Sequence, residues 1–396
     1  MAMTGARSFF DHAATTPLRR EAIDAMVAAR ASADGNPSAL HAEGRAARAA
    51  LDDARATIAR LVSARPREIV FTGGGSEANN LAIAGAVRAA GIAGAHVVTV
   101  ATEHHAVLHT VEALRDEGVR VTVLGVDSAG RVDPAAFASA LEPRTVLATI
   151  MLANNEIGTI APIVDLARIA RERGVLFHCD AVQAVGRLPL DVRELGVDLL
   201  SLSAHKCYGP KGVGALYVRT GTPLRPLVFG GPQEAGTRAG TENVAGIVGF
   251  AAAFAATEAE RTDEMIRVGA LRDRLEREIL ATIAGTRVNA AGVPRLANVA
   301  SVAFADCDAT ELLVRLDLAG FAVSTGSACA AGAAERSHVL AAIDAPAWAR
   351  RGTLRFSLGM RSGEQDVERL VRMLPDAASC ARVGRADMGM VVLGSA

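Results

Sequence analysis

Short apolar segments alternate with helix-like segments through the middle of the chain, over residues 95–218. The apolar segments are HVVTVA, VRVTVLGV, TVLATIML, VLFHCD, VDLLSLS and VGALYV, and helical periodicity appears near 107–116, from 134 onward and near 164–173. Near-continuous Val, Leu and Ile in the strands, with helices between them, is typical of a parallel sheet covered on both faces. The pattern therefore predicts an α/β fold with a mostly parallel sheet.

The flanking regions predict further helices and a second, smaller domain. Helical periodicity begins near residue 21 and resumes at 43–62, and a long helix is expected at 244–280, which we interpret as a connector. The remainder mixes strands such as 299–304 and TLRFSLG with the helix ATELLVRLDLAG, which indicates a small α+β domain. We expect a large domain at residues 15–258 and a small domain formed by residues 1–14 and 259–396.

Polar residues gather where four of the predicted strands end. In sheets of this kind ligands bind beyond the carboxyl ends of the strands. We therefore expect a single site there. The residues are Glu103, His104 and His105 after one strand, Asn154, Asn155 and Glu156 after another, Asp180 and Gln183 after a third, and Ser203 to Lys206 after a fourth.

A glycine run, GGGSEANN, leads from the predicted strand at 68–72 directly into a helical pattern, with Gly75 and Ser76 near the helix start. Glycine lets the backbone approach an anion closely, and the unpaired N–H groups of a first helical turn point at it. This arrangement suits a phosphate group. Glycines before a helix are also common turn residues, so the motif alone leaves both interpretations open.

The chain contains only two lysines, Lys206 and Lys211, and every other Lys or Arg position is an arginine. Arginine carries a charge but cannot become a nucleophilic amine. Lys206, in a turn of small residues at a strand end, therefore suggests a lysine that forms a Schiff base. Two solvated lysines in a Gly-Pro loop are the alternative.

Composition narrows the classes of function. With 396 residues, 50% of them hydrophobic, the chain can bury a large core. A formal net charge of −1 provides no basic surface for nucleic acid. The first ten residues lack a secretory signal and the longest apolar uncharged run, 243–257, is too short to span a bilayer, so we expect a cytoplasmic protein. Five cysteines without a CxxC pair predict neither disulfides nor a metal site.

Taken together, the motifs resemble those of the pyridoxal-phosphate-dependent cysteine desulfurases of the nitrogen-fixation and iron–sulfur-cluster kind. They occur in order over almost the whole chain: DHAATTP, GNPSALHAEGR, FTGGGSEANN, TEHHAVL, NNEIGTIAPI, HCDAVQAVG, SLSAHKCYGPKG, AGTEN, STGSACAAG and LRFSLG. The resemblance implies a fold-type I enzyme and a homodimer. It also implies conversion of L-cysteine to L-alanine, with the sulfur passing to an acceptor such as an iron–sulfur scaffold or a thiolation enzyme.

The resemblance assigns the cofactor residues. It implies that Lys206 binds pyridoxal 5′-phosphate and later, as a free amine, takes the Cα proton of the substrate. Asp180 would pair with the pyridine nitrogen, and Gln183 would hydrogen-bond the phenolic oxygen. The phosphate would be held by Gly75, Ser76, Ser203 and His205, with Thr241 reaching it from the neighbouring subunit.

The same resemblance assigns the substrate contacts. His104 would stack on the cofactor ring and shuttle protons, whereas His105 beside it has no assigned role and is expected to be a packing residue. Asn155 and Arg355 would lie near the substrate carboxylate, for which a planar guanidinium is well suited, and Asn155 would also contact the cofactor.

Cys329 lies in the small-residue segment STGSACAAGAAERSHVL, which the sequence predicts to be mobile. A thiolate there could attack the substrate sulfur and carry it as a persulfide. The length of the segment resembles the branch of the family that hands sulfur to separate acceptor proteins. We expect Cys179, Cys207 and Cys307 to be buried small hydrophobes.

Four positions depart from the family pattern. Ser76 stands where threonine is common, Cys207 where phenylalanine is common, Arg187 where lysine is common, and Arg336 where proline is common.

Two other classes of function stay open. One is a different fold-type I enzyme, such as a selenocysteine lyase or an aminotransferase, and the other is a non-catalytic sulfur-transfer scaffold. Cys329 argues against an aminotransferase, and the retention of Lys206 and Asp180 together with Cys329 argues against a scaffold.

Overall fold

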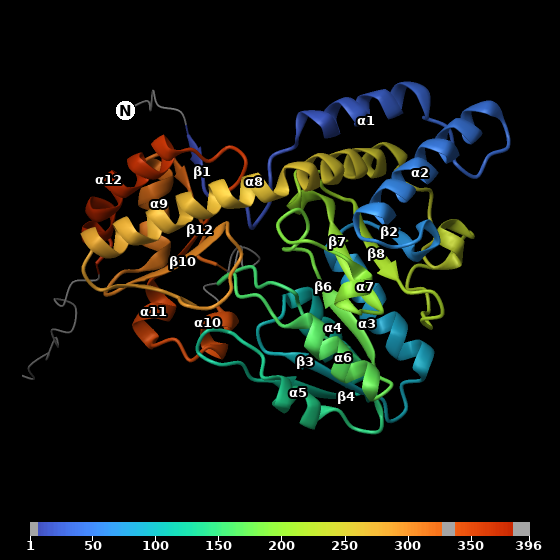
Figure 1. The fold of residues 1–396 in the computed structure, drawn as a ribbon, viewed down its shortest axis with the longest axis horizontal. Helices are drawn as coiled ribbons and strands as arrows, with labels where there is room; N and C mark the ends of the chain where they lie inside the picture. Colours follow the sequence, from blue (N-terminus) through green and yellow to red (C-terminus); the bar gives the residue numbers. More distant parts are fainter. Residues whose placement is uncertain (1–6, 327–336, 383–396) are drawn as a thin grey trace, which may run out of the picture.

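A computed structural model describes residues 7–326 and 337–382 of the chain. Its centre is a seven-stranded sheet with the strand order β2-β8-β7-β6-β5-β3-β4 (Figure 1). The predicted α/β fold with a mostly parallel sheet is confirmed. The strands are β2 (Ile69–Thr72), β3 (His96–Val100), β4 (Arg120–Leu124), β5 (Thr145–Thr149), β6 (Leu176–Asp180), β7 (Leu199–Ser203) and β8 (Gly214–Val218).

One strand of this sheet departs from the parallel arrangement. β8 pairs antiparallel with both β2 and β7, whereas β4, β3, β5, β6 and β7 run parallel to one another. A parallel partner requires a crossover of about a dozen residues or more. The connection from Ser203 to Gly214 is shorter than such a crossover and passes only through the short turn η2 (Ala204–Lys206). The chain therefore reverses direction here and presents this turn at the end of β7.

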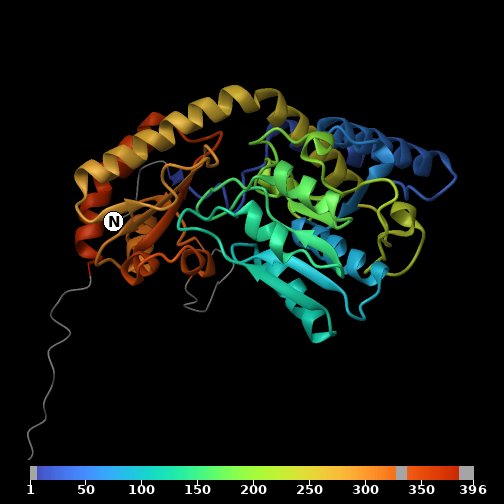
Figure 2. The ribbon, with the colours of Figure 1, turned by 60° about the horizontal axis from the view of Figure 1, so that its bottom comes forward.

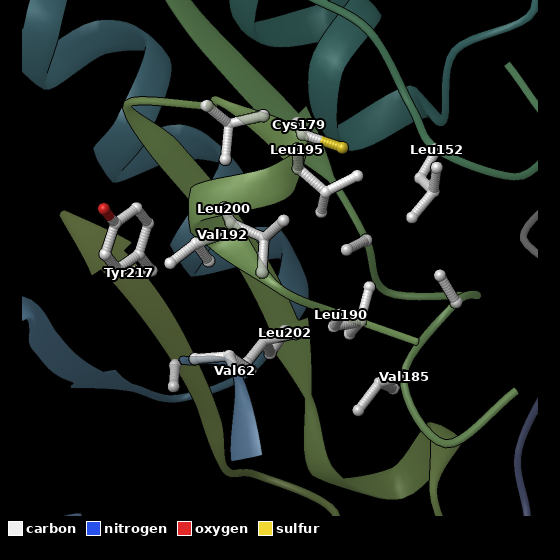
Figure 3. Close-up of a cluster of buried hydrophobic side chains, with 14 of the residues drawn as sticks. Val62, Leu152, Cys179, Val185, Leu190, Val192, Leu195, Leu200, Leu202 and Tyr217 are labelled. Atoms are coloured by element: carbon white, nitrogen blue, oxygen red, sulfur yellow. The ribbon is translucent and has the colours of Figure 1, made fainter. Parts of the chain in front are cut away.

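Helices cover both faces of the sheet. Because side chains alternate along a strand, Leu200 and Leu202 of β7 enter one core cluster, part of which is seen in Figure 3, and Leu199 enters another on the opposite face. The first cluster includes residues of α2 (Ala42–Leu61), α5 (Pro134–Ala140), α6 (Ile163–Glu172), α7 (Val192–Leu195) and α8 (Val244–Thr282), and the second includes residues of α3 (Gly75–Ala90) and α4 (His105–Asp116).

The long helix α8 connects this region to a second core (Figures 1 and 2). Its first half packs on α1 (Arg20–Ser32) and α2, and its second half contributes Val268, Leu271 and Leu275 to the core of the smaller sheet. This agrees with the expected connector helix. The division of domains at residue 258 stays a prediction.

The smaller sheet is antiparallel, with the order β12-β10-β9. A two-residue strand near the start of the chain, β1, pairs in parallel with β11, which brings the N-terminal segment beside this region. The elements are β1 (Ser8–Phe9), β9 (Thr286–Val288), β10 (Val299–Phe304), α9 (Ala309–Leu318), β11 (Phe321–Ala322), α10 (His338–Ala342), α11 (Ala347–Gly352), β12 (Thr353–Ser357) and α12 (Glu364–Cys380).

Two further features concern the described part of the chain. Within residues 7–326 and 337–382, no helix has both the length and the apolar character needed to cross a membrane. In the same ranges, no group of three or more His, Cys, Asp or Glu side chains is arranged to hold a metal ion.

His178 lies inside the large sheet and links three neighbouring strands. Its ring nitrogens contact the hydroxyl groups of Thr149 on β5 at 2.7 Å and Ser201 on β7 at 2.9 Å. Burial lowers the pKa of His178 from 6.5 to about 3. The folded protein therefore holds this ring neutral at pH values where the unfolded chain would protonate it.

We expect the free energy of unfolding to fall as the pH drops from 6.5 towards 3, because His178 binds a proton only after unfolding in this range. One such group contributes a slope of about 1.4 kcal/mol per pH unit. We measure the free energy of unfolding by urea at pH 7, 6 and 5. In the His178→Gln variant it should depend less steeply on pH, because one proton fewer is taken up on unfolding. His109→Gln, at an exposed position of α4, is the control. Equal slopes for wild type and His178→Gln would contradict this assignment.

Candidate active site

A cavity of about 360 Å³ lies beyond the carboxyl ends of β6 and β7 and beside the start of α3. It gathers ten of the twelve residues to which the family resemblance assigns a role. A larger and more open hollow of about 710 Å³, which includes Arg55 and Glu234, contains none of them among its described lining residues. The ten residues are Gly75, Ser76, His104, Asn155, Asp180, Gln183, Ser203, His205, Lys206 and Arg355.

The amine of Lys206 is held by the backbone near the start of the chain. Its Nζ donates hydrogen bonds to the carbonyl oxygens of Ala13 at 2.6 Å and Ala14 at 2.7 Å. Lys206 ends the turn η2 directly after β7, so the short reversal towards β8 aims its side chain into the cavity. The other lysine, Lys211, is exposed.

Asp180, at the end of β6, is oriented by two hydrogen bonds. Its Oδ2 accepts from Nδ2 of Asn79 at 2.6 Å, and its Oδ1 accepts from the backbone N–H of Val182 at 2.9 Å. Asn79 is almost fully buried and lines the cavity. Sequence reasoning missed this residue, although its position one helical turn after Ser76 places it on the same face of α3.

The start of α3 forms a close-fitting cradle. A Cβ atom at Gly75 would lie 2.6 Å from Cγ2 of Val182, so glycine is needed for this approach of helix and loop. The first N–H groups of a helix have no partner within it. The buried Oγ of Ser203 and Oε1 of Gln183 also have no hydrogen-bond partner among the described residues. Unpaired donors and acceptors around one cavity suit a polar, phosphorylated ligand.

Two histidines of the cavity have lowered pKa values. Burial, followed by the charge of Lys206, lowers the pKa of His205 to about 4. Burial also lowers the pKa of His104, whose Nδ1 accepts the N–H of Ala106 at 3.0 Å and caps α4. An accepting Nδ1 places the ring proton on Nε2. His104 can therefore donate a hydrogen bond from Nε2 while its orientation is fixed through Nδ1.

His105 has more contacts than a simple packing residue. It lines the cavity, and its ring lies 4.7 Å from that of His338 and 5.0 Å, stacked, from that of His109. His338 contacts the backbone oxygen of Glu103 through Nε2 at 2.8 Å. These contacts link the start of α4 to the start of α10.

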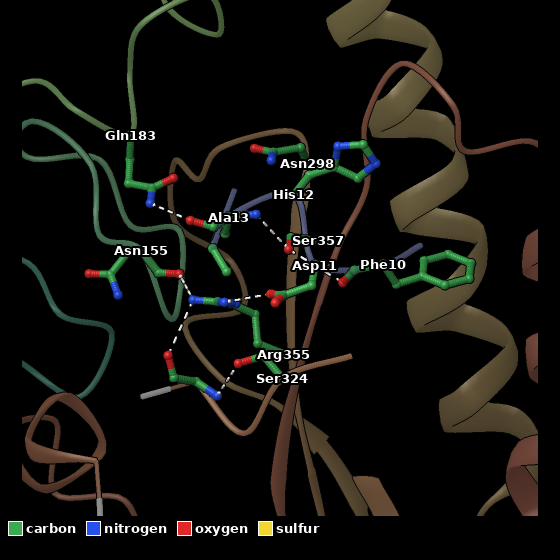
Figure 4. A network of polar contacts seen from close by, with 12 residues as sticks. Phe10, Asp11, His12, Ala13, Asn155, Gln183, Asn298, Ser324, Arg355 and Ser357 are labelled. Atoms are coloured by element: carbon green, nitrogen blue, oxygen red, sulfur yellow. Dashed lines mark hydrogen bonds and ion pairs between the residues drawn. The ribbon is translucent and has the colours of Figure 1, made fainter. Parts of the chain in front are cut away.

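Arg355, on β12, brings the small sheet into the site (Figure 4). Its side chain is almost fully buried. Nη2 forms an ion pair with Oδ1 of Asp11 at 2.8 Å, and Nη1 donates to the carbonyl oxygens of Asn155 at 2.8 Å and Gly326 at 3.2 Å. Its Nε has no hydrogen-bond partner among the described residues. Sequence reasoning did not identify Asp11, which is 344 positions away in the chain.

The remaining predicted residues lie elsewhere or cannot be placed. Thr241 is exposed, between η3 (Gln233–Gly236) and α8, and does not line the cavity of its own chain. Cys329 lies outside the described residues. The expected burial of Cys179, Cys207 and Cys307 agrees with the structure, and burial raises the pKa of the Cys207 thiol to about 12.

Comparison with known proteins identifies the family. Residues 8–370 match the family described as aminotransferase class-V. The chain is 48% identical to the cysteine desulfurase IscS of Dictyoglomus turgidum, over 91% of each chain. The chain belongs to the cysteine desulfurases. Enzymes of this family depend on pyridoxal 5′-phosphate, and the cradle at Gly75 and the unpaired Ser203 and Gln183 atoms fit that group.

Further relatives support the same placement within the cysteine desulfurases. A cysteine desulfurase of Bradyrhizobium diazoefficiens is 46% identical over 94% of this chain and 95% of the relative. A solved NifS-like protein superposes with a TM-score of 0.88 at 33% identity, covering 94% of this chain and all of that chain. The structure titled SspA in complex with cysteine has a TM-score of 0.79 at 37% identity, covering 89% and 99%. The fold is therefore that of a fold-type I enzyme.

The Asn79→Ala variant should bind pyridoxal phosphate more weakly, because Asp180 would lose the amide that orients it towards a ring nitrogen. Loss of a hydrogen bond to a charged group costs about 1.5–3 kcal/mol, or roughly 10- to 100-fold in affinity. Absorbance titration of cofactor-free protein measures this. Asn80→Ala is the matched control, since its amide donates to the Ser76 carbonyl rather than to Asp180. Equal affinities for Asn79→Ala and wild type would refute the role.

Proposed function

We propose that this cysteine desulfurase converts L-cysteine to L-alanine and holds the sulfur as a persulfide on Cys329 for transfer to an acceptor protein. The observation that carries the proposal is the convergence of an amine, a carboxylate and a guanidinium on one cavity, in Lys206, Asp180 and Arg355. A chain that served only as a scaffold would not need these three groups in one buried site.

Different described residues would bind different parts of the cofactor. Lys206 would bind it covalently, Asp180 would pair with its ring nitrogen, and Gln183 would hydrogen-bond its phenolic oxygen. Its phosphate group would lie at the start of α3. When bound, pyridoxal phosphate supplies an electron sink for negative charge at the substrate Cα. The phosphate contacts would come from Gly75, Ser76, Ser203 and His205, with His104 and Asn155 against the ring.

Lys206 would accept a proton through Nζ, and His104 would present an N–H group at Nε2. Nζ of Lys206, as a neutral amine, would take the Cα proton, and the carbonyl groups of Ala13 and Ala14 would then accept hydrogen bonds from the ammonium group. Nε2 of His104 would donate a hydrogen bond, because its Nδ1 is engaged by the Ala106 N–H. The two groups therefore supply a base and a hydrogen-bond donor within one cavity.

Arg355 would bind the substrate carboxylate together with Asn155. Its ion pair with Asp11 and its bonds to two carbonyl groups fix the guanidinium plane. A fixed planar guanidinium recognises a carboxylate with less loss of side-chain freedom on binding. The unpartnered Nε shows that the hydrogen-bonding capacity of Arg355 is not exhausted among the described residues.

Cys329 would accept the sulfur. Its thiolate attacks the substrate sulfur, an S–S bond forms, and the C–S bond breaks. The carbon fragment keeps the electron pair and takes up protons to become alanine. Gly326 lines the cavity, and Cys329 follows it three positions later in the chain. The other thiols near the site, Cys179 and Cys207, are buried and have raised pKa values.

We further propose a cytoplasmic homodimer whose sulfur goes to an acceptor such as an iron–sulfur scaffold. Thr241 is exposed and absent from its own cavity, as expected for a residue that reaches the phosphate of a partner subunit. The name IscS of several relatives favours iron–sulfur cluster assembly. A selenocysteine substrate would use the same described residues. Analysis of the products formed from cysteine and from selenocysteine distinguishes the two activities.

The Cys329→Ser variant should still show a cysteine-dependent change of the cofactor spectrum but release alanine at least about 100-fold more slowly, because a serine hydroxyl stays protonated and is a poor nucleophile towards sulfur. Amino-acid chromatography measures the alanine. Cys380→Ser, at the exposed cysteine of α12, is the control and should keep wild-type turnover. Wild-type turnover in Cys329→Ser would mean that another group receives the sulfur.

A further inference from the structure

Glu156 lies in a tight turn at the edge of the cavity. The turn is closed by a bridge between Ala153 and Ile160, and Oδ1 of Asn154 accepts the N–H groups of Glu156 at 2.8 Å and Ile157 at 3.0 Å. The Glu156 side chain is only 4% exposed and lines the cavity. These contacts fix the backbone of the turn independently of any contact made by the Glu156 carboxyl group.

The Glu156 carboxyl group holds the residue that follows the segment 327–336. Oγ of Ser337 donates a hydrogen bond to Oε2 of Glu156 at 2.5 Å. The same Oγ accepts the N–H of Leu340 at 3.0 Å and caps α10. Glu156 thus fixes Ser337 together with the start of that helix.

The same carboxyl oxygen also lies close to the residue that precedes the segment. A Cβ atom at Gly326 would lie 2.8 Å from Oε2 of Glu156, so the glycine backbone packs directly against it. Gly326 has φ of +97°, a conformation that other residues rarely adopt. Its carbonyl oxygen accepts from Arg355, and its N–H donates to Oγ of Ser324 at 3.2 Å. The two residues that flank the segment, Gly326 and Ser337, therefore both lie beside Oε2 of Glu156.

We propose that Glu156 is a positioning residue that fixes both ends of the segment 327–336, and with them the tether of Cys329, beside the substrate cavity. This inference rests on the proposed role of Cys329. A nucleophile tethered at two fixed points has a higher effective concentration at its target than one on a looser tether. Glu156 therefore raises the rate of sulfur transfer to Cys329 and contributes little to the binding of cysteine.

The surroundings of Glu156 indicate that its size and its acceptor oxygen matter more than its charge. Burial raises the pKa of the Glu156 carboxyl group, and the Ser337 hydrogen bond, His338 and Arg355 only partly offset this. Glutamine has the same length and keeps an oxygen that can accept from Ser337. Alanine removes the contact with both ends of the segment.

The test compares Glu156→Ala with Glu156→Gln in the cofactor-loaded enzyme. Two quantities are measured separately: the affinity for cysteine from the cofactor spectrum, and the single-turnover rate of persulfide formation on the Cys329 peptide by mass analysis. For Glu156→Ala we expect a cysteine affinity within about threefold of wild type and a transfer rate at least about 10-fold lower. Glu156→Gln should keep at least about a third of the wild-type rate.

A second variant perturbs the contact from the other side. Gly326→Ala places a Cβ atom against Oε2 of Glu156 and should lower the transfer rate as Glu156→Ala does, which also provides the test if Glu156→Ala does not fold. Thr159→Val is the matched control. It removes one hydrogen bond of the same turn, from Oγ1 to the Ala129 carbonyl, without touching either end of the segment, and should transfer sulfur at the wild-type rate.

Distinct outcomes separate this inference from the proposed function. If wild type forms no persulfide on Cys329, the proposed function fails. If wild type does form it, and Glu156→Ala transfers at the wild-type rate or Glu156→Gln is as slow as Glu156→Ala, the positioning role is overturned. A loss of cysteine affinity equal to the loss of transfer rate would also overturn it, because Glu156 would then act on substrate binding.

Discussion

The carbonyl groups of Ala13 and Ala14 hold the Lys206 amine, and the arrangement of the site depends on where this backbone runs. The segment 11–14 is fixed from both sheets at once. From β12, Arg355 binds Asp11, and Oγ of Ser357 accepts the N–H of Ala13. From the large sheet, Gln183 donates to the Ala13 carbonyl at 2.9 Å (Figure 4). Lys206 is thus positioned by a junction between the two cores. A shift of either core would move its acceptors.

Burial determines which groups of this junction carry charge. His12 is fully buried and has its pKa lowered to about 3, mainly by burial and then by the charge of Arg187. Burial, followed by the charge of Asp180, raises the pKa of the Glu103 carboxyl group. The raised pKa of Glu103 disfavours a second negative charge beside Asp180. The low dielectric of the interior therefore disfavours charge on groups that would compete with those proposed to bind the cofactor and substrate.

The pattern along the chain predicted the sheet, the connector helix and the convergence of polar residues at strand ends, because each depends on local periodicity or on a general rule of α/β sheets. Because the chain contains only two lysines, the sequence alone singled out Lys206 as a candidate for the Schiff base. The antiparallel direction of β8 follows from a short connection and could have been foreseen. Asp11 beside Arg355, and Ser337 beside Glu156, could not, because nothing local in a sequence records a contact between residues 344 or 181 positions apart.

The most direct test of this account is to identify the lysine that binds the cofactor. Reduction of the purified enzyme with sodium borohydride would fix a pyridoxyl phosphate group permanently to that amine, and the chain offers only two candidates. Peptide mass analysis should place the added group on Lys206, whose amine lies in the cavity with Asp180 and Arg355. An added group on the exposed Lys211, or on neither lysine, would contradict the account.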